Sequence, residues 1–311
     1  MPYLALNPLR RLVYKLNSEL IMWHAISKHI SEQLNIPFVI THKEQLNLSS
    51  NSLTFTIGDG THQFFVKVDV PQKLEQFEAE AYNLKELTLH SALFVPDCIC
   101  YGLTLNHSFI VLEWLPLTNQ ADNNWFEMGK LIALMHKKHE QAMYGWPDDN
   151  FLGQTIQTNR WHKHWDIFFA EQRIGWQLQL LAEKEFHFCE IDAFIELTKA
   201  SLHSHVVQPS LLHGDLWRGN VGFVDGTPAL FDPACYFGDR EVDIAMTQLF
   251  GEFPAAFYQG YQDHYPLSAS YEQRKPFYQL YHILQHANAF QGHYLIEAKE
   301  KIADILHTAA R

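Results

Sequence analysis

Residues 211–243 of the chain read LLHGDLWRGNVGFVDGTPALFDPACYFGDREVD, and this stretch carries the strongest indication of the fold. Asp215, Asn220 and Asp232 follow one another in it, and short apolar segments separate the last two. Carboxylate and amide oxygens are the ligands that magnesium prefers in proteins. The stretch therefore predicts a site in which Asp215 accepts a proton while the other two side chains hold a metal ion.

The same spacing occurs in the catalytic loop of protein kinases, where H-R-D-x-x-x-x-N is followed by the aspartate of D-F-G. Here the first motif is H-G-D at residues 213–215, and the last is D-P-A at residues 232–234. Phosphoryl transfer needs a positioned metal, neutralised charge and an oriented hydroxyl. We therefore expect a small-molecule kinase that uses ATP and Mg²⁺. A plain turn is the alternative for H-G-D taken alone.

An apolar strand upstream carries a single lysine. The sequence FFVKV places Lys67 among apolar neighbours, and a buried lysine is costly unless it is paired. The helix predicted over 73–90 offers Glu78 and Glu80 as partners. Glu80 has leucines at i+4 and i+7 on its own side, so we expect it to pair with Lys67 and to direct the lysine toward the phosphates of ATP. A surface lysine on an edge strand is the alternative.

The order of the predicted elements indicates an α+β chain with two lobes, and 311 residues suffice for two domains. A helix over 23–38 precedes a hairpin that turns at Asp59-Gly60, a helix over 73–90 and two further strands. From about Trp125 the pattern is mainly helical. We predict a protein-kinase-like fold with an N-terminal extension or accessory helix 1–21, a small β-rich N-lobe 22–112, a linker 113–118 and a mainly helical C-lobe 119–311.

Composition and charge limit the partners. The chain has 23 lysines and arginines against 35 aspartates and glutamates, and this net charge of −12 repels the phosphate backbone of nucleic acids. No window approaches the ~20 apolar residues of a membrane span, so we expect no membrane partner. The four cysteines are too few and too dispersed for a disulfide framework or a four-ligand zinc site, which favours a cytoplasmic setting.

Two histidine-rich segments, WHKHW at 161–165 and HSH at 203–205, could suggest a metal site. Neither has carboxylates or cysteines at metal-ligand spacing in the sequence. We therefore expect these histidines to be solvated or packed in the core.

At HGDLWRGN, FDPACYFGDREVD and FFVKV the chain resembles the fructosamine (ketosamine) kinase family, which belongs to the aminoglycoside-phosphotransferase-like branch of the kinase fold. FEAEAYNL is similar to the family's helix that pairs with the lysine. NFLGQTIQTNRWHKHWDIFFAEQRIGWQLQ is similar to the insert that precedes its catalytic loop. The resemblance runs from about Met22 to the C-terminus and is strongest to bacterial ketosamine kinases.

The resemblance implies ATP-dependent phosphorylation of the 3-hydroxyl of a sugar joined as a ketoamine to an amine or to a lysine of a protein. The 3-phosphate then decomposes and frees the amine, so the implied role is deglycation and protein repair. It implies that Asp215 is the base, that Asn220 and Asp232 bind Mg²⁺, and that Lys67 with Glu80 holds the phosphates. A monomer or a homodimer fits equally well.

Further site residues follow from the same resemblance. The backbone at Glu113, Trp114 and Leu115 is expected to hold adenine. Trp217 either stacks on the apolar face of the sugar or packs the loop. His213 is a candidate substrate contact and orients the loop through hydrogen bonds. The remaining polar residues are expected to form an ion network that organises loops, and they are Asp239, Arg240 and Asp243.

One departure from the family concerns the loop that covers the nucleotide, which usually carries glycines that let the backbone approach phosphate. Here the equivalent segment 46–53 reads LNLSSNSL and has no glycine. Ser49 and Ser50, followed by Asn51, offer hydroxyl and amide donors instead. Weaker or slower ATP binding, or a changed nucleotide preference, is the expected consequence.

Two other functions fit parts of the pattern. A kinase for another hydroxylated amine, of the aminoglycoside or choline type, would share the catalytic loop, but the insert and the W-R-G-N form of the loop count against it. A nucleotide-binding pseudokinase would fit the glycine-free loop. Retention of Asp215, Asn220, Asp232 and Lys67 opposes that reading, because a protein that only binds has no need of a base.

Overall fold

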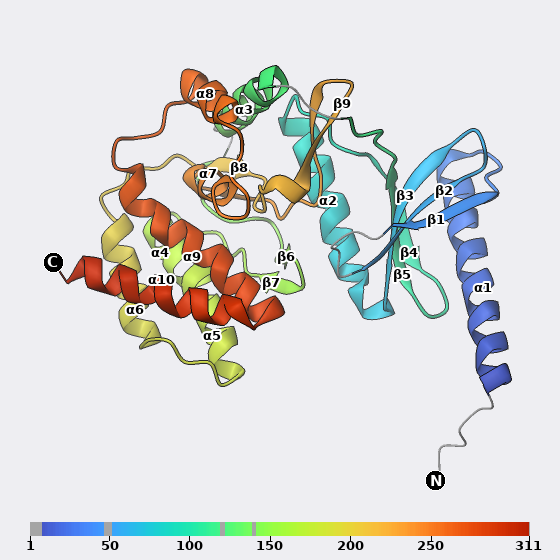
Figure 1. Cartoon of the computed structure of the whole chain (residues 1–311), viewed down its shortest axis with the longest axis horizontal. Helices are drawn as coiled ribbons and strands as arrows, with labels where there is room; N and C mark the ends of the chain where they lie inside the picture. The colour runs from blue at the N-terminus through green and yellow to red at the C-terminus, as the bar shows by residue number, and fades with distance from the viewer. Residues whose placement is uncertain (1–7, 47–51, 119–121, 139–140, 311) are drawn as a thin grey trace, which may run out of the picture. The chain divides into compact units, whose positions relative to one another are not determined.

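The computed structural model describes residues 8–46, 52–118, 122–138 and 141–310. The chain forms two compact units (Figure 1). The first comprises Met1–Lys85 and Pro96–Pro116, and the second comprises Glu86–Val95 and Leu117–Arg311. The first is built on a β-sheet and the second is mainly helical, so the predicted α+β class is confirmed. The boundary after Pro116 falls inside the segment 113–118 that the sequence predicts to be a linker.

The first unit contains a five-stranded antiparallel sheet with the order β1-β2-β3-β5-β4. The central strand β3 carries Lys67, which pairs in register with Thr54 on β2 and Ile110 on β5. Lys67 therefore sits in the middle of the sheet and not on an edge strand. The strands are β1 (His42–Leu46), β2 (Leu53–Gly58), β3 (Gln63–Asp69), β4 (Cys98–Leu103) and β5 (Ser108–Glu113).

The hairpin between β2 and β3 turns where the sequence predicts. The Asp59 carboxylate accepts the backbone N–H groups of Thr61 and His62, and Gly60 has a φ of 95°. Only glycine adopts such a φ without strain. A short polar side chain followed by glycine is thus sufficient to close this turn.

Helix α1 (Pro8–Leu34) covers one face of the sheet with an apolar stripe that includes Ile26 and Ile30, both fully buried. It starts earlier and stops sooner than the predicted helix 23–38. Asn35, with a φ of 54°, ends it, and Leu34, the last residue of the helix, is 36% exposed.

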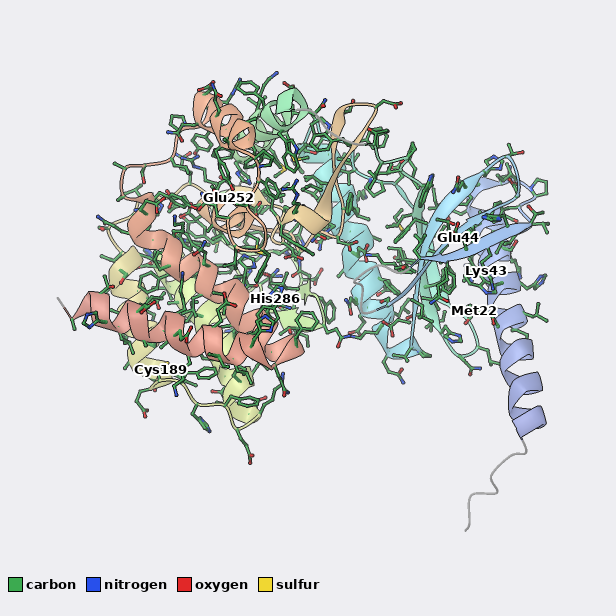
Figure 2. The ribbon with its side chains drawn as sticks, viewed as in Figure 1. Met22, Lys43, Glu44, Cys189, Glu252 and His286 are labelled. Carbon is green, nitrogen blue, oxygen red and sulfur yellow. The ribbon has the colours of Figure 1, made fainter. Side chains whose placement is uncertain are left out.

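Helix α1 is also tied to the sheet by charge. Lys43 on β1 forms an ion pair with Glu19 and lies 4.9 Å from the ring centre of Trp23, and Figure 2 shows Lys43 near Met22 on the helix. Glu19 belongs both to the expected extension 1–21 and to helix α1. Part of that extension is therefore continuous with a helix that packs on the sheet. Residues 1–7 lie outside the described part.

Helix α2 (Leu74–His90) occupies the predicted range 73–90 almost completely. A 3₁₀ turn at Pro71–Lys73 leads into it. Phe77, Leu84 and Leu87 are buried along one stripe, as helical periodicity requires. This stripe fixes the rotation of the helix about its axis and thereby the direction in which Glu80 points.

In the second unit, helices surround the segments that carry the catalytic motif (Figure 1). Helices α3 (Asp122–His136) and α8 (Ala255–His264) approach closely because each contributes a glycine to the contact. A Cβ atom on Gly129 would lie 2.0 Å from the carbonyl oxygen of Phe257, and one on Gly260 would lie 2.1 Å from that of Phe126. The other helices are α4 (Trp165–Phe169), α5 (Trp176–Glu183), α6 (Ile191–Leu202), α7 (Glu241–Thr247), α9 (Tyr271–Phe290) and α10 (His293–Ala309).

Short two-stranded ribbons hold the loops between these helices, and each pairs antiparallel. A π-helical turn at Ala170–Gly175 joins α4 to α5, so the helical backbone widens locally between them. No helix among the described residues combines the length and apolar character needed to cross a bilayer. The ribbons are β6 (Asn150–Leu152) with β7 (Thr155–Gln157), β8 (Ser210–Leu212) with β11 (Tyr236–Gly238), and β9 (Val221–Val224) with β10 (Thr227–Leu230).

Candidate active site

The catalytic loop leaves the buried strand β8 through a turn that only glycine permits. Gly214 has a φ of 82°, and a Cβ atom there would lie 2.0 Å from the carbonyl oxygen of Ala234. The Asp243 carboxylate on α7 accepts the backbone N–H groups of His213 and Gly214 at 2.7 and 2.9 Å. A fully buried carboxylate therefore fixes the start of the loop that presents Asp215.

His213 is held from both ring nitrogens. Its Nδ1 accepts the backbone N–H of Asp215 at 3.2 Å, and its Nε2 donates to the carbonyl oxygen of Phe231 at 3.0 Å. These contacts require a neutral ring, and burial also lowers the pKa of His213. The contacts agree with the expectation that His213 orients the loop. The ring is fully buried, which leaves its expected contact with substrate without support from the geometry.

Asn220 lies on a 3₁₀ turn (Arg218–Asn220) and binds the candidate base directly. Its Nδ2 donates to the Asp215 carboxylate at 2.9 Å and to the Asp215 carbonyl oxygen at 3.0 Å. Because Nδ2 faces Asp215, the amide oxygen of Asn220 is the atom left to serve a metal ion. The two residues that the sequence pairs by spacing are thus in contact.

Asp232 follows β10 with a φ of 55°, a left-handed conformation that aspartate adopts more readily than most residues. The residues on either side of it are bound to the catalytic loop. The Phe231 N–H donates to the carbonyl oxygen of Asn220 at 3.1 Å, and the Ala234 N–H donates to that of His213 at 2.8 Å. The fold therefore brings Asp232 to the other two predicted residues.

The pKa of Asp215 reflects this clustering. The pKa of Asp215 is raised to about 7, chiefly by burial and in addition by the negative charges of Asp232 and Asp243, while hydrogen bonds from Asn220 and Trp217 oppose the rise. Carboxylates gathered in this way have an excess of negative charge that a divalent cation would offset. The donors are all oxygen atoms, which suits magnesium and not a soft metal.

Trp217 lies within the loop. A Cβ atom on Gly219 would lie 2.3 Å from the indole ring, so the ring packs directly on this glycine, and its N–H contributes a hydrogen bond to Asp215. Of the two expected roles, loop packing is therefore visible in the structure. Stacking on a sugar stays a prediction.

Asp243 is supported by groups that sequence reasoning missed. His136 Nε2 on α3 lies 3.1 Å from its carboxylate, and His136 Nδ1 lies 2.9 Å from the Tyr261 hydroxyl on α8. Burial raises the pKa of Asp243, but the hydrogen bonds and charges of His136 and the N–H of Gly214 outweigh it, so the pKa lies below its usual range. Nothing in the local sequence around His136 indicates this long-range contact.

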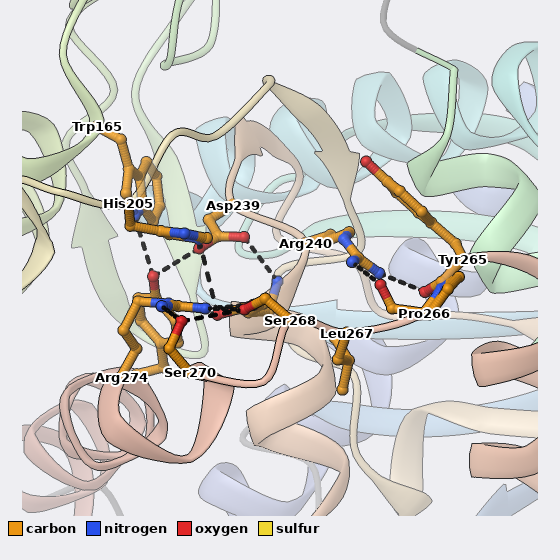
Figure 3. Close-up of polar contacts among 12 residues, drawn as sticks. Trp165, His205, Asp239, Arg240, Tyr265, Pro266, Leu267, Ser268, Ser270 and Arg274 are labelled. Carbon is orange, nitrogen blue, oxygen red and sulfur yellow. Dashed lines mark hydrogen bonds and ion pairs between the residues drawn. The ribbon is translucent and has the colours of Figure 1, made fainter.

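Asp239 and Arg240, the two residues that precede α7, contact other parts of the second unit (Figure 3). Asp239 accepts hydrogen bonds from the Tyr278 hydroxyl at 2.6 Å and from His205 at 2.9 Å. Arg240 donates to the carbonyl oxygens of Tyr265 and Pro266. The expected loop-organising role is visible in these contacts, although Arg240 binds carbonyl groups and not a carboxylate.

The histidines of HSH lie beside carboxylates, and the side chain of His203 is exposed, in agreement with the expectation of a solvated histidine. His203 lies 2.8 Å from Asp166, and His205 lies near both Asp239 and Glu241. The fold supplies carboxylates that sequence spacing does not reveal. Glu241 binds Arg274 through both of its oxygens at 2.8 Å, so an arginine occupies the place that a metal would need in this cluster.

The first unit contains the predicted ion pair. Lys67 Nζ lies 2.8 Å from Glu80 Oε1, and Lys67 is 7% exposed. The choice of Glu80 over Glu78 as partner is confirmed, since Glu78 is exposed. A buried lysine held in this way has a fixed direction.

The segment expected to hold adenine begins where β5 ends. Glu113 donates its backbone N–H to the carbonyl oxygen of Asp97 at 2.9 Å, and Leu115 is buried. The adenine contact of Glu113, Trp114 and Leu115 stays a prediction. Ser49 and Ser50 lie outside the described residues.

Comparisons with known proteins agree on one family. The model of the fructosamine kinase family matches residues 22–308. A Vibrio parahaemolyticus protein named Probable ketoamine kinase is 48% identical over 286 residues, which cover 92% of this chain and 99% of the relative.

Solved structures extend the likeness to the fold. The crystal structure named for a fructosamine-3-kinase from Haemophilus somnus has a TM-score of 0.87 at 36% identity and covers 91% of this chain and 97% of its own. A thermostable mutant of an aminoglycoside phosphotransferase, in a ternary complex with AMP-PNP and hygromycin B, has a TM-score of 0.60 at 15% identity. The match covers 92% of this chain and 99% of the other, and this likeness shows the fold alone.

The raised pKa of Asp215 predicts a pH-dependent effect on stability. Because the folded-state pKa of about 7 lies above the ordinary aspartate value of 3.8, ionisation opposes folding increasingly as pH rises through this window. We expect Asp215→Asn to raise the free energy of unfolding of the metal-free protein by at least about 1 kcal/mol more at about pH 8 than at about pH 4.5. The reason is that one pKa unit corresponds to about 1.4 kcal/mol. Denaturant unfolding in EDTA at both pH values measures the difference.

Asp225→Asn is the matched control, because Asp225 is exposed on the turn between β9 and β10, and its φ of 47° suits asparagine. Its effect on the free energy of unfolding should be small and the same at both pH values. A pH dependence of Asp215→Asn no larger than that of Asp225→Asn would contradict the predicted pKa.

Proposed function

Because the chain belongs to the fructosamine kinase family, we propose that it transfers the terminal phosphoryl group of ATP to the 3-hydroxyl of a ketosamine of the ribulosamine or fructosamine type. The observation that carries the proposal is the contact between Asp215 and Asn220 beside Asp232, in a loop fixed by Asp243. The phosphorylated sugar then decomposes and frees the amine, so the activity removes sugars from glycated amines or proteins.

Asp215 acts as the general base in this proposal. Its pKa near 7 lets a carboxylate take the proton of a sugar hydroxyl at neutral pH, which is the regime in which a general base is effective. The hydrogen bonds from Asn220 and Trp217 keep the carboxylate in one orientation. An incoming cation would lower this raised pKa and keep the base ionised.

Asn220 and Asp232 would hold Mg²⁺, which neutralises phosphate charge as it develops during transfer. Lys67, directed by Glu80, would bind phosphate oxygens of the nucleotide. The aminoglycoside phosphotransferase with the same fold holds an ATP analogue, which supports ATP as the donor. Trp217 would stack on the sugar, since one face of a sugar ring is apolar.

A substrate panel tests the function. The purified protein is incubated with ATP, Mg²⁺ and ribulosamines, fructosamines or aminoglycosides, and phosphate transfer to each acceptor is measured. We expect turnover on the ketosamines that falls by at least ~10²-fold in Asp215→Asn, because a general base typically contributes this much. Asp225→Asn should keep wild-type turnover, because that residue lies exposed in a turn.

Two outcomes would overturn the proposal. Turnover confined to aminoglycosides would assign the chain to a different acceptor class. Nucleotide binding without transfer to any acceptor would indicate a binding protein and not an enzyme.

Substitutions of Glu80 and Glu78 form a second matched pair of variants. Glu80→Gln removes the charge that directs the buried Lys67, whereas Glu78→Gln changes an exposed residue on the same helix. A charged hydrogen bond contributes about 1.5–3 kcal/mol, so we expect kcat/KM for ATP to fall at least about tenfold in Glu80→Gln. Steady-state kinetics with ATP as the varied substrate measure it, and an equal loss in Glu78→Gln would show that the ion pair has no special role.

A further inference from the structure

Arg173 is a fully buried cation on the π-helical turn Ala170–Gly175. Within the part of the chain that the structure describes, no carboxylate lies within ion-pair distance of it. Its guanidinium donates to the carbonyl oxygen of Thr158 and to Asn159 Oδ1 at 2.7 Å, and it lies 4.0 Å from the ring centre of Tyr236. Burial of an unpaired cation is strongly unfavourable, so these contacts must compensate for it.

Asn159 transmits the contact to a second buried amide. Its oxygen accepts from Arg173, so its Nδ2 must face the other way, where it donates to Asn150 Oδ1 at 2.9 Å. The Asn150 amide is oriented in turn, and its Nδ2 donates to the carbonyl oxygen of Cys235 at 2.7 Å. Because a guanidinium can only donate, Arg173 sets the direction of the successive hydrogen bonds that run through Asn159 and Asn150 to the carbonyl oxygen of Cys235.

Gln157 on β7 adds a parallel contact. Its Nε2 donates to Asn150 Oδ1 at 2.7 Å and to the carbonyl oxygen of Ala234 at 3.1 Å, while its Oε1 accepts from the Tyr281 hydroxyl at 2.5 Å. Two successive carbonyl groups, those of Ala234 and Cys235, are thus bound by buried amides. Both follow closely on Asp232.

The peptide at Ala234 is held on both sides, since its N–H binds the carbonyl oxygen of His213 and its carbonyl oxygen binds Gln157. Asp232, two residues earlier, adopts a left-handed φ of 55°. A residue in a sparsely populated conformation keeps it only when its surroundings enforce it. The buried amides of Gln157 and Asn150 supply that constraint through the carbonyl oxygens of Ala234 and Cys235.

We propose that Arg173, Asn159, Asn150 and Gln157 form a polar relay that positions Asp232 for its metal ion. The proposal rests on the proposed function, because that function assigns the metal to Asp232. The four residues are positioning residues, since they act through the backbone of Ala234 and Cys235. The relay would explain why the insert before the catalytic loop contains a buried arginine without a carboxylate partner.

A matched pair of glutamines tests the relay. Gln157 and Gln177 are each 1% exposed, and each binds a buried amide. Gln177 binds Asn288 between α5 and α9, and within the described part of the chain it makes no hydrogen bond to the segment 232–235. We expect Gln157→Leu to weaken Mn²⁺ binding in the presence of ADP about tenfold or more, as is typical when a group supporting a metal ligand is lost. Gln177→Leu should stay within about twofold of wild type even where it lowers the thermal midpoint equally. Electron paramagnetic resonance of free Mn²⁺ measures the affinity.

Arg173→Lys keeps the charge but cannot make the forked contact, so it tests the same relay if Gln157→Leu does not fold. It should weaken Mn²⁺ binding similarly and increase hydrogen exchange in the peptide that contains residues 231–236. Unchanged affinity in Arg173→Lys and Gln157→Leu would overturn the proposal, as would an equal loss in Gln177→Leu or an absence of Mn²⁺ binding in the wild type. Because this readout needs no sugar acceptor, a wild type that binds Mn²⁺ with ADP but phosphorylates no ketosamine would refute the proposed function and leave the relay standing.

Discussion

The buried carboxylate of Asp243 is the interaction on which the second unit's site depends. It accepts two successive backbone N–H groups of the catalytic loop and is itself oriented by His136. Removal of a buried carboxylate from such a set would leave both donors unsatisfied, which is far more unfavourable than the loss of a surface contact. The positions of His213 and Gly214, and through them of Asp215, follow from this one anion.

The carboxylate of Asp243 also affects the pKa of the candidate base. Burial raises the pKa of Asp215, and the negative charges of Asp232 and Asp243 raise it in addition, so ionisation of Asp215 is unfavourable in the free protein. A divalent cation bound beside these carboxylates would offset their negative charge. The proposed polar relay from Arg173 would have the complementary task, because it would fix Asp232 through hydrogen bonds to the backbone carbonyl groups that follow it.

The sequence predicts those features that depend on local spacing. Asp215 and Asn220 belong to one short loop, and Glu80 is placed by the apolar stripe of its own helix, so both contacts could be predicted. The contacts of His136 and His205 could not, because their partners lie far along the chain and are brought near only by tertiary packing. The end of the helix predicted over 23–38 was wrong for a related reason, because periodicity predicts a face but not the residue at which a helix ends, and this helix ends at Leu34.

The central claim concerns where the phosphoryl group goes, and phosphorus-31 nuclear magnetic resonance of the product tests it most directly. With ATP, Mg²⁺ and a fructosamine, the proposed chemistry predicts a new phosphomonoester signal that couples to the proton on carbon 3 of the sugar, formed in step with ADP. Release of inorganic phosphate alone, or an ester at a different carbon, would contradict it.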